Sequence, residues 1–269
     1  MSILRVLAGA AVVVGLIACD APVTSGNCGA VAPAHAVALV DSPLTTVAQR
    51  ALLAAYPDHL ARFEGNFLIW KDSTRMVWDD GRVKAGEELL DDPDLEDIFA
   101  QPYPRSSVVF QVDYDPGRCR PNAFFMKIYG GSEAEVRARL VPVAWFGQEL
   151  QFNREAGAAA ALERVANRLA KSPEVLPYLT PSAGTFNWRV VAGTQRLSNH
   201  SFGIAIDLNV SHAHYWRWSK EFKAGKPLVY QNKIPLRIVQ AFEAEGFIWG
   251  GKWYHYDTMH FEYRPELLK

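Results

Sequence analysis

The sequence has little net charge and few cysteines. Its 269 residues carry a formal charge of −1 at pH 7 and include three cysteines. A near-neutral chain offers no basic field to a phosphate backbone, which excludes nucleic acid as a leading partner. No two cysteines show the Cys-x-x-Cys spacing, so a zinc site made from cysteine pairs is also excluded.

Two of the cysteines, Cys28 and Cys119, lie far apart in the chain. In an oxidising compartment they could form a disulfide that ties the N-terminal tail to a turn at residues 115–117. Their spacing neither requires nor excludes this bond, and the sequence leaves it open.

The apolar run near the N-terminus is short. It covers residues 6–17, too few to span a bilayer comfortably. Arg5 precedes the run and small residues follow it, which is typical of an export signal at residues 1–18. The tetrapeptide ending at Cys19 resembles the lipobox of bacterial lipoproteins, which predicts export to the cell envelope or periplasm and a membrane anchor at lipidated Cys19. The alternative is simple cleavage and release near Ala34.

The rest of the chain shows no internal repeat and no low-complexity linker between two halves. Residues 19–37 are rich in Ala, Pro, Gly, Ser and Thr, and we expect a flexible tether there. Residues 38–269 are expected to form one α+β domain with a small, mostly antiparallel sheet flanked by helices. Its residues 38–150 would be an accessory layer, and residues 151–269 would be the catalytic core.

Local patterns predict the elements of this domain. Helical spacing of apolar residues predicts helices at 45–60, 133–140 and 154–171. Runs rich in β-formers predict strands at 67–70, 76–78, 107–114, 123–129, 141–146 and 186–192. The first two strands would form a hairpin, and its Trp70 and Trp78 would either line a cleft or belong to the core. The acidic stretch 91–97 lacks the spacing of a calcium loop and is expected to be a solvated turn before a helix.

The residues that carry chemistry form two half-motifs. Residues 198–207 read Ser-Asn-His-Ser-Phe-Gly-Ile-Ala-Ile-Asp, and residues 257–262 read Asp-Thr-Met-His-Phe-Glu. His200 and His260 offer imidazole nitrogens and Asp207 offers a carboxylate. This mixed set is what a catalytic zinc ion with an open fourth position uses, so we predict a site for one zinc ion.

Side-chain alternation constrains the first half-motif. A continuous strand would place His200 and Asp207 on opposite faces, because their separation is odd. Gly203 permits a break in the chain between them. Beyond that break, Ala205 and Asp207 share one face, and the small alanine leaves room for a metal ion.

Alternation also assigns roles in the second half-motif. His260 and Glu262 would share one face of a strand, so Glu262 is expected to orient His260. Asp257 must lie in a bend before that strand if it is to act as the base, and Glu262 is its rival for that role. The turn at residues 250–253 and the nearby aromatic residues predict an aromatic-walled cleft; these residues are Trp249, Trp253, Tyr254 and Tyr256.

The two half-motifs together resemble the zinc signature of the D-alanyl-D-alanine carboxypeptidase-like metallopeptidases. This group includes vancomycin-resistance D,D-peptidases and phage L-alanyl-D-glutamate endolysins, with hedgehog proteins as structural relatives. The resemblance covers about residues 180–265. It implies a hedgehog-like zinc core, zinc ligation by His200, Asp207 and His260, and Asp257 as the catalytic base.

Family members also use an arginine upstream of the first histidine to hold a substrate carboxylate or polarise the scissile carbonyl. Arg189 and Arg196 are both candidates, and the spacing does not choose between them. Arg118 and Arg120 could hold a carboxylate but are more typical of a solvated surface. His255 could contact substrate or be structural.

The predicted function is that of an exported, lipid-anchored zinc peptidase that hydrolyses peptidoglycan stem peptides. The bond cut is either the terminal D-Ala-D-Ala bond or the L-Ala-D-Glu bond. The alternative is a zinc-containing module that binds cell-wall peptides or a partner protein without hydrolysis.

Overall fold

The computed structural model describes residues 43–191 and 193–269. The described residues form one compact unit of the α+β class, with small antiparallel sheets and helices, as predicted. None of the helices described is both long enough and apolar enough to cross a bilayer. The predicted signal, the tether and Cys28 lie outside the described residues, so the lipid anchor and the disulfide stay predictions. Cys119 is buried, and its burial raises the pKa of the thiol to about 12.

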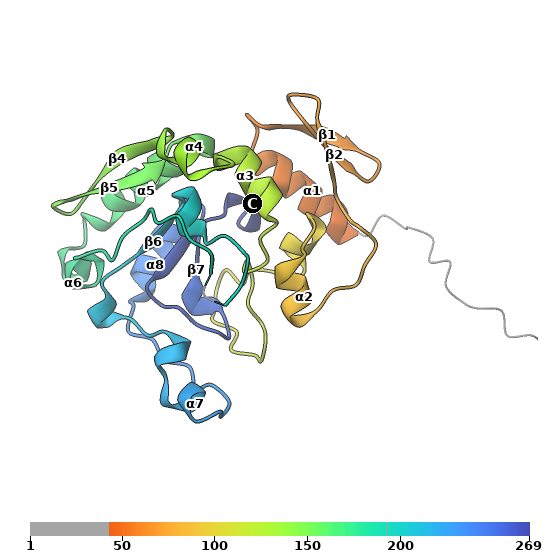
Figure 1. The fold of residues 1–269 in the computed structure, drawn as a ribbon. Helices are drawn as coiled ribbons and strands as arrows, with labels where there is room; N and C mark the ends of the chain where they lie inside the picture. The colour runs from red at the N-terminus through yellow and green to blue at the C-terminus, as the bar shows by residue number, and fades with distance from the viewer. Residues whose placement is uncertain (1–42, 192) are drawn as a thin grey trace, which may run out of the picture. The chain divides into compact units, whose positions relative to one another are not determined.

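Short strands are interspersed among the helices along the chain (Figure 1). Within the described residues, the α-helices are α1 Pro43–Ala55, α2 Gly86–Asp91, α3 Asn122–Tyr129, α4 Glu133–Arg137, α5 Ala158–Leu169, α6 Leu176–Leu179, α7 Lys220–Lys223 and α8 Leu236–Glu243. The strands are β1 Leu60–Glu64, β2 Phe67–Trp70, β3 Arg75–Val77, β4 Leu140–Trp145, β5 Gln148–Asn153, β6 Ala205–Asp207, β7 Phe247–Trp249 and β8 His260–Tyr263.

The strands pair into three antiparallel sheets. Their orders are β1-β2-β3, β4-β5 and β6-β8-β7. The third sheet matters most for function, because its central strand β8 carries the second half-motif and its edge strand β6 carries the end of the first. Helix α8 packs on β7 and on α5, and α5 packs in turn on β4 (Figure 1). These layers support the back of the third sheet.

One buried apolar cluster extends through the described domain and contains residues from both predicted parts, such as Leu52 and Ile206. The hairpin β2-β3 forms as predicted, and a third strand β1 extends it. Trp70 and Trp78 are both 3% exposed and belong to this core, so of the two predicted roles the core role applies. The subdivision at residue 150 stays a prediction.

Three predicted strands do not form, and two of them lie before residue 130. Residues 123–129 lie in helix α3, in which Phe124, Phe125 and Ile128 are buried at helical spacing. The segment is rich in residues that favour strands, and this composition concealed the helical spacing of its apolar residues. That spacing decides the structure when a segment packs on one side only. Residues 107–114 form no strand because no other strand of the described chain pairs with them. Their Phe110 ring instead packs against the rings of Tyr230 and Tyr254.

Other predicted elements change length. The first helix ends at Ala55, because Pro57 disfavours helical conformation in the residue before it. The helix predicted from 154 begins at Ala158 and buries the expected apolar face. Residues 186–191 belong to no sheet, and within the described residues a single bridge joins Val190 to Leu197. The strand predicted from 186 was therefore wrong.

The acidic stretch at residues 91–97 has an exposed start and leads into the 3-10 helix Glu96–Phe99, as predicted, but Asp94 and Asp97 are not free in solvent. The ammonium group of Lys84, whose side chain is fully buried, lies 2.9 Å from Asp80, 3.1 Å from Asp94 and 2.8 Å from Asp97. Although burial alone would lower it, these carboxylates raise the pKa of Lys84 above its usual range. Carboxylates that are shielded from water need a counter-charge, and Lys84, which precedes this stretch in the chain, supplies it.

Candidate metal centre and active site

The register of the third sheet brings the two half-motifs together. Asp207 on β6 pairs directly with His260 on β8, and Ala205 pairs with Glu262. Because directly paired residues point to the same face, these four side chains share one side of the sheet. Ile206 and Phe261 point to the other side and are fully buried. The alternation predicted within each half-motif is therefore confirmed. The pairing of β6 with β8 then brings the two half-motifs into contact.

His200 reaches this face from a turn. It lies in the 3-10 helix Asn199–Phe202, whose first backbone groups are capped by Ser198. The helix ends at Gly203, which adopts a left-handed φ of 66°. A Cβ atom at this glycine would lie 2.6 Å from Leu140 Cδ2, so glycine is needed for both conformation and space. The predicted break at Gly203 is confirmed, and it turns His200 toward Asp207.

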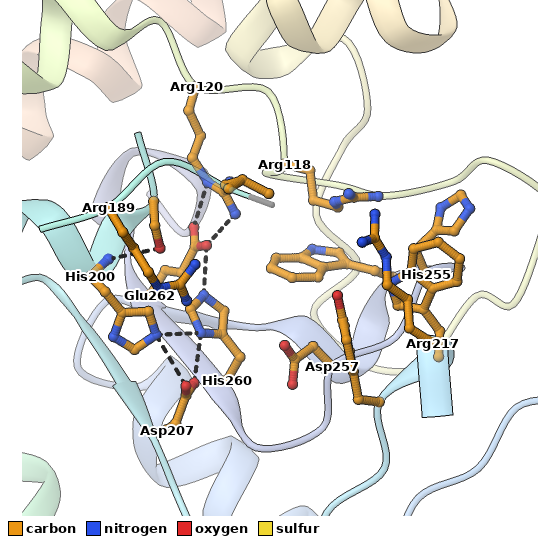
Figure 2. A pocket seen from close by; sticks show the side chains of 15 residues that line it. Arg118, Arg120, Arg189, His200, Asp207, Arg217, His255, Asp257, His260 and Glu262 are labelled. Carbon is orange, nitrogen blue, oxygen red and sulfur yellow. Dashed lines mark hydrogen bonds and ion pairs between the residues drawn. The ribbon is translucent and has the colours of Figure 1, made fainter. Parts of the chain in front are cut away.

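Three ligand atoms converge at this point. His200 Nε2 lies 3.2 Å from His260 Nδ1 and 3.2 Å from Asp207 Oδ2, and His260 Nδ1 lies 2.8 Å from Asp207 Oδ1. In a tetrahedral zinc site with metal–ligand distances of about 2.0–2.1 Å, neighbouring ligand atoms lie about 3.3 Å apart. The three predicted ligands thus already have nearly the spacing that such an ion requires (Figure 2).

The hydrogen bonds behind the ligands fix which nitrogen of each imidazole faces inward. His200 Nδ1 lies 2.7 Å from the carbonyl oxygen of Thr185, which only accepts, so Nδ1–H donates and Nε2 keeps its lone pair. His260 Nε2 lies 2.8 Å from Glu262 Oε1 and likewise donates. Two lone pairs and a carboxylate then face one another, an arrangement that only a positive charge between them stabilises.

The electrostatics of the cluster agree with this donor set. Although burial alone would lower it, the pKa of His260 is raised to about 10 by Asp207 and Glu262. Although burial alone would raise it, the pKa of Asp207 is lowered below its usual range by His200 and His260. The cluster therefore stabilises a positive charge, either as an additional proton or as a metal ion. The residues fit a zinc ion in ligand type, number and spacing.

Glu262 orients His260 and is not placed as a base. Its side chain is fully buried and forms ion pairs with Arg120 and Arg264. Asn199 Nδ2 donates to it over 2.6 Å. Burial would raise the pKa of Glu262, but Arg120 and His260 lower it below its usual range, so it stays ionised. A permanently ionised carboxylate bonded to a ligand histidine holds that ring in position.

Asp257 lies in the predicted bend before β8. Its backbone bridges to Tyr215, and a turn at residues 258–259 separates it from the strand. Its Oδ1 atom is buried and has no hydrogen-bond partner within the described part of the chain. Burial and the nearby Asp207 raise its pKa to about 7. An unengaged carboxyl group with a pKa near neutrality is suited to accept and return a proton.

A cavity of about 150 Å³ connects these groups. Arg189 lines it, and Ser201 fixes the backbone of this residue through hydrogen bonds of 2.9 and 2.7 Å. Arg196 does not line it and instead lies 2.8 Å from Asp91. Of the two arginines that the sequence left open, the structure therefore brings only Arg189 to the metal ligands.

The comparison with protein families agrees with these observations. Residues 192–263 match the family model described as D-alanyl-D-alanine carboxypeptidase. This part of the chain is similar to that family. The predicted resemblance is thus confirmed, and the coarser conclusion that the protein is a peptidase is supported. No curated protein and no solved structure matches the chain.

The D-alanyl-D-alanine carboxypeptidase-like segment contains the three ligands and Asp257 but leaves part of the pocket wall outside it. Arg118 and Arg120 come from the loop before α3, and Arg189 comes from the segment before the His200 turn. Arg120 does contact a carboxylate, but that carboxylate is the protein's own Glu262.

Sequence reasoning missed three residues of this wall, Tyr215, Trp216 and Arg217. Their aromatic and basic types were the available signal, but nothing local indicated that they face the site. Of the predicted aromatic wall, Trp253 lines the cavity, whereas Trp249 packs in the core. Tyr254 and Tyr256 pack instead around Phe110.

Proposed function

We propose that this protein is a zinc-dependent peptidase that hydrolyses peptide bonds of peptidoglycan stem peptides. The observation that carries the proposal is the convergence of His200 Nε2, His260 Nδ1 and the Asp207 carboxylate beside an unengaged Asp257. The family match supports the peptidase class and this kind of substrate. The core would then be of the hedgehog and D,D-peptidase type.

His200, Asp207 and His260 would hold the zinc ion. When bound, the ion supplies a positive charge that polarises the scissile carbonyl and lowers the pKa of a water molecule. Asp257 would accept a proton from the attacking water as the oxygen of that water bonds to the carbonyl carbon. The same carboxyl group then donates the proton to the departing amine as the C–N bond breaks, so its protonation state is restored.

Arg189 is positioned to hold a negatively charged part of the substrate or the developing oxyanion, because its backbone is fixed to the His200 turn. Arg196 is not proposed for this role, because its side chain pairs with Asp91. Whether the enzyme removes a terminal D-alanine or cuts an internal L-Ala-D-Glu bond is decided by the substrate groups that the other end of the pocket accepts.

The proposal includes export to the cell envelope and lipidation at Cys19. A peptidase for stem peptides needs access to the wall, and an anchor at the membrane surface would provide it. Mass spectrometry of the membrane fraction tests this directly: a diacylglyceryl group on Cys19 is expected, whereas a mature protein that begins near Ala34 would overturn it.

Hydrolysis is tested with wild type and Asp257→Ala, comparing zinc content with turnover of purified muropeptides. We expect the variant to keep one zinc ion and to lose at least about 100-fold in kcat, in line with removal of a general base. Asp58→Ala, which alters an exposed carboxylate outside the pocket, serves as the matched control and should match wild type. Wild-type protein that binds zinc and cleaves no stem peptide would instead indicate a non-catalytic binding module.

A further inference from the structure

The pocket has a second cationic end, separate from the one at Arg189. Arg118 comes from the loop before α3, and Arg217 comes from the 3-10 helix Trp216–Trp218. Figure 2 shows the two guanidinium groups on the side of Asp257 away from the His200, Asp207 and His260 cluster. The pKa of the Tyr215 hydroxyl is raised, mainly by burial and further by Asp257. Arg217 and Arg118 both act in the opposite direction, so both charges lie near this hydroxyl.

A continuous set of contacts holds this end in shape. The Arg217 guanidinium lies 5.0 Å from the centre of the Trp216 ring, and the Trp216 and His255 rings lie 4.6 Å apart. His255 Nδ1 donates to Asp115 over 2.7 Å, and Arg118 donates to the same carboxylate over 2.6 Å. His255 thus links the two walls and itself lines the pocket.

The segment that carries Arg217 is also fixed to the base. Tyr215 bridges to Asp257, and the amide of Trp216 donates to the carbonyl of Tyr256 over 2.9 Å. The amide of Thr258 donates to His214 over 2.9 Å. Backbone hydrogen bonds on both sides of the bridge therefore hold the segment that precedes Arg217 against the segment that contains Asp257.

The charges at this end are not balanced within the protein. Arg120 is paired with Glu262, and one nitrogen of Arg118 is taken by Asp115. Among the residues that the structure describes, Arg217 has no carboxylate within ion-pair distance, and it is exposed beside the cavity. Guanidinium groups that converge on a pocket with free donors are suited to bind a carboxylate in fork geometry.

We propose that Arg118 and Arg217 bind a carboxylate of the substrate residue that is released as the amine. The inference rests on the proposed peptidase function. Asp257 lies between the metal ligands and these arginines in Figure 2 and returns its proton to the departing amine, so this end of the pocket receives the leaving residue. The carboxylate is either the free terminus of that residue or its acidic side chain.

Two matched pairs of peptides distinguish these sources. The first pair is an N-acylated peptide ending in D-alanyl-D-alanine and its C-terminal amide. The second is an L-alanyl-D-glutamyl peptide amide and its D-glutaminyl counterpart. Wild type should prefer the charged member of one pair by about 10- to 100-fold in kcat/KM, the usual effect of a lost charge-assisted hydrogen bond. A preference in the first pair assigns carboxypeptidase action, and one in the second assigns endopeptidase action.

The variant Arg217→Gln should lower kcat/KM for the charged member far more than for its neutral partner, so that the difference between the two peptides is lost. Arg237→Gln, on the exposed face of α8, is the matched control and should keep the preference. Equal cleavage of charged and neutral peptides by wild type, or a preference that survives in Arg217→Gln, would overturn the inference while leaving the proposed function intact.

If wild type hydrolyses none of these peptides, the proposed function fails and the inference is decided by binding. Isothermal titration calorimetry of the zinc-loaded protein should then show tighter binding of the charged member and loss of that difference in Arg217→Gln. Equal affinities for both members of each pair would reject the carboxylate site.

Discussion

Replacing Glu262 by glutamine tests how the metal centre is supported. Glu262 is fully buried, and its ion-pair partners Arg120 and Arg264 have side chains only 11% and 0% exposed. Removing one partner of a buried pair costs about 3–5 kcal/mol, because the other charge is left without compensation. Arg264 retains Glu266, so the uncompensated charge is that of Arg120. We expect the free energy of unfolding to fall by this amount.

The chain offers a matched control in Glu245→Gln. Glu245 also pairs with two arginines, Arg164 and Arg168, but their side chains are 54% and 55% exposed. Exposed pairs contribute about 0.2–1 kcal/mol each. For a domain of this size, about 1 kcal/mol shifts Tm by about 2–4 °C, so Glu262→Gln should lower Tm by about 6–20 °C and the control by much less.

The same pair of variants separates folding from metal binding. Urea denaturation followed by tryptophan fluorescence gives the free energy of unfolding, and chelator competition gives the zinc affinity. Glu262→Gln should weaken zinc binding by about 10- to 100-fold, because His260 loses the carboxylate that orients it. Glu245→Gln should not change it. If both variants unfold alike and bind zinc alike, Glu262 does not support the site in the way described.

Three further predictions concern the His200 turn, the base and the arginines. Gly203→Ala should destabilise the fold by about 1–3 kcal/mol in urea denaturation, because the residue has a left-handed φ and its Cβ would contact Leu140; an unchanged midpoint would contradict this. Asp257 acts in its deprotonated form, and its pKa is raised to about 7 without metal, so kcat/KM should fall on acidification. The midpoint should lie at or below pH 7, because a bound cation lowers the pKa of this carboxyl group. A rate that rises toward acid pH would refute the assignment. Arg189→Gln should lower kcat/KM for stem peptides by about 10-fold or more, whereas Arg196→Gln should leave it nearly unchanged, and equal losses would contradict the positions of the two side chains.

Much of the site follows from local geometry and was predictable from the sequence. The period of a strand is two residues, so the shared face of His260 and Glu262 and that of Ala205 and Asp207 could be stated without a structure. The conflict between that period and the spacing of His200 and Asp207 required a break, and Gly203 was the residue able to provide it. The bend at Asp257 followed by the same reasoning.

The remainder depends on contacts between distant segments. Nothing local specifies that Asp207 pairs with His260 and not with a neighbour, because strand register is set by the packing of both faces. The cationic wall likewise joins Arg118 to Arg217, which belong to separate segments of the chain. The failures in the fold have a similar cause: residues 107–114 have strand-forming composition but no partner strand, and composition cannot reveal a missing partner.

The most direct test of the account is the position of the metal ion. Crystals grown with zinc and measured at the zinc absorption edge should show one strong anomalous peak about 2.0–2.2 Å from His200 Nε2, His260 Nδ1 and an Asp207 carboxylate oxygen. His260 should bind through Nδ1 because its Nε2–H donates to Glu262. A peak elsewhere, ligation through His260 Nε2, or no peak in the presence of excess zinc would contradict the proposed centre.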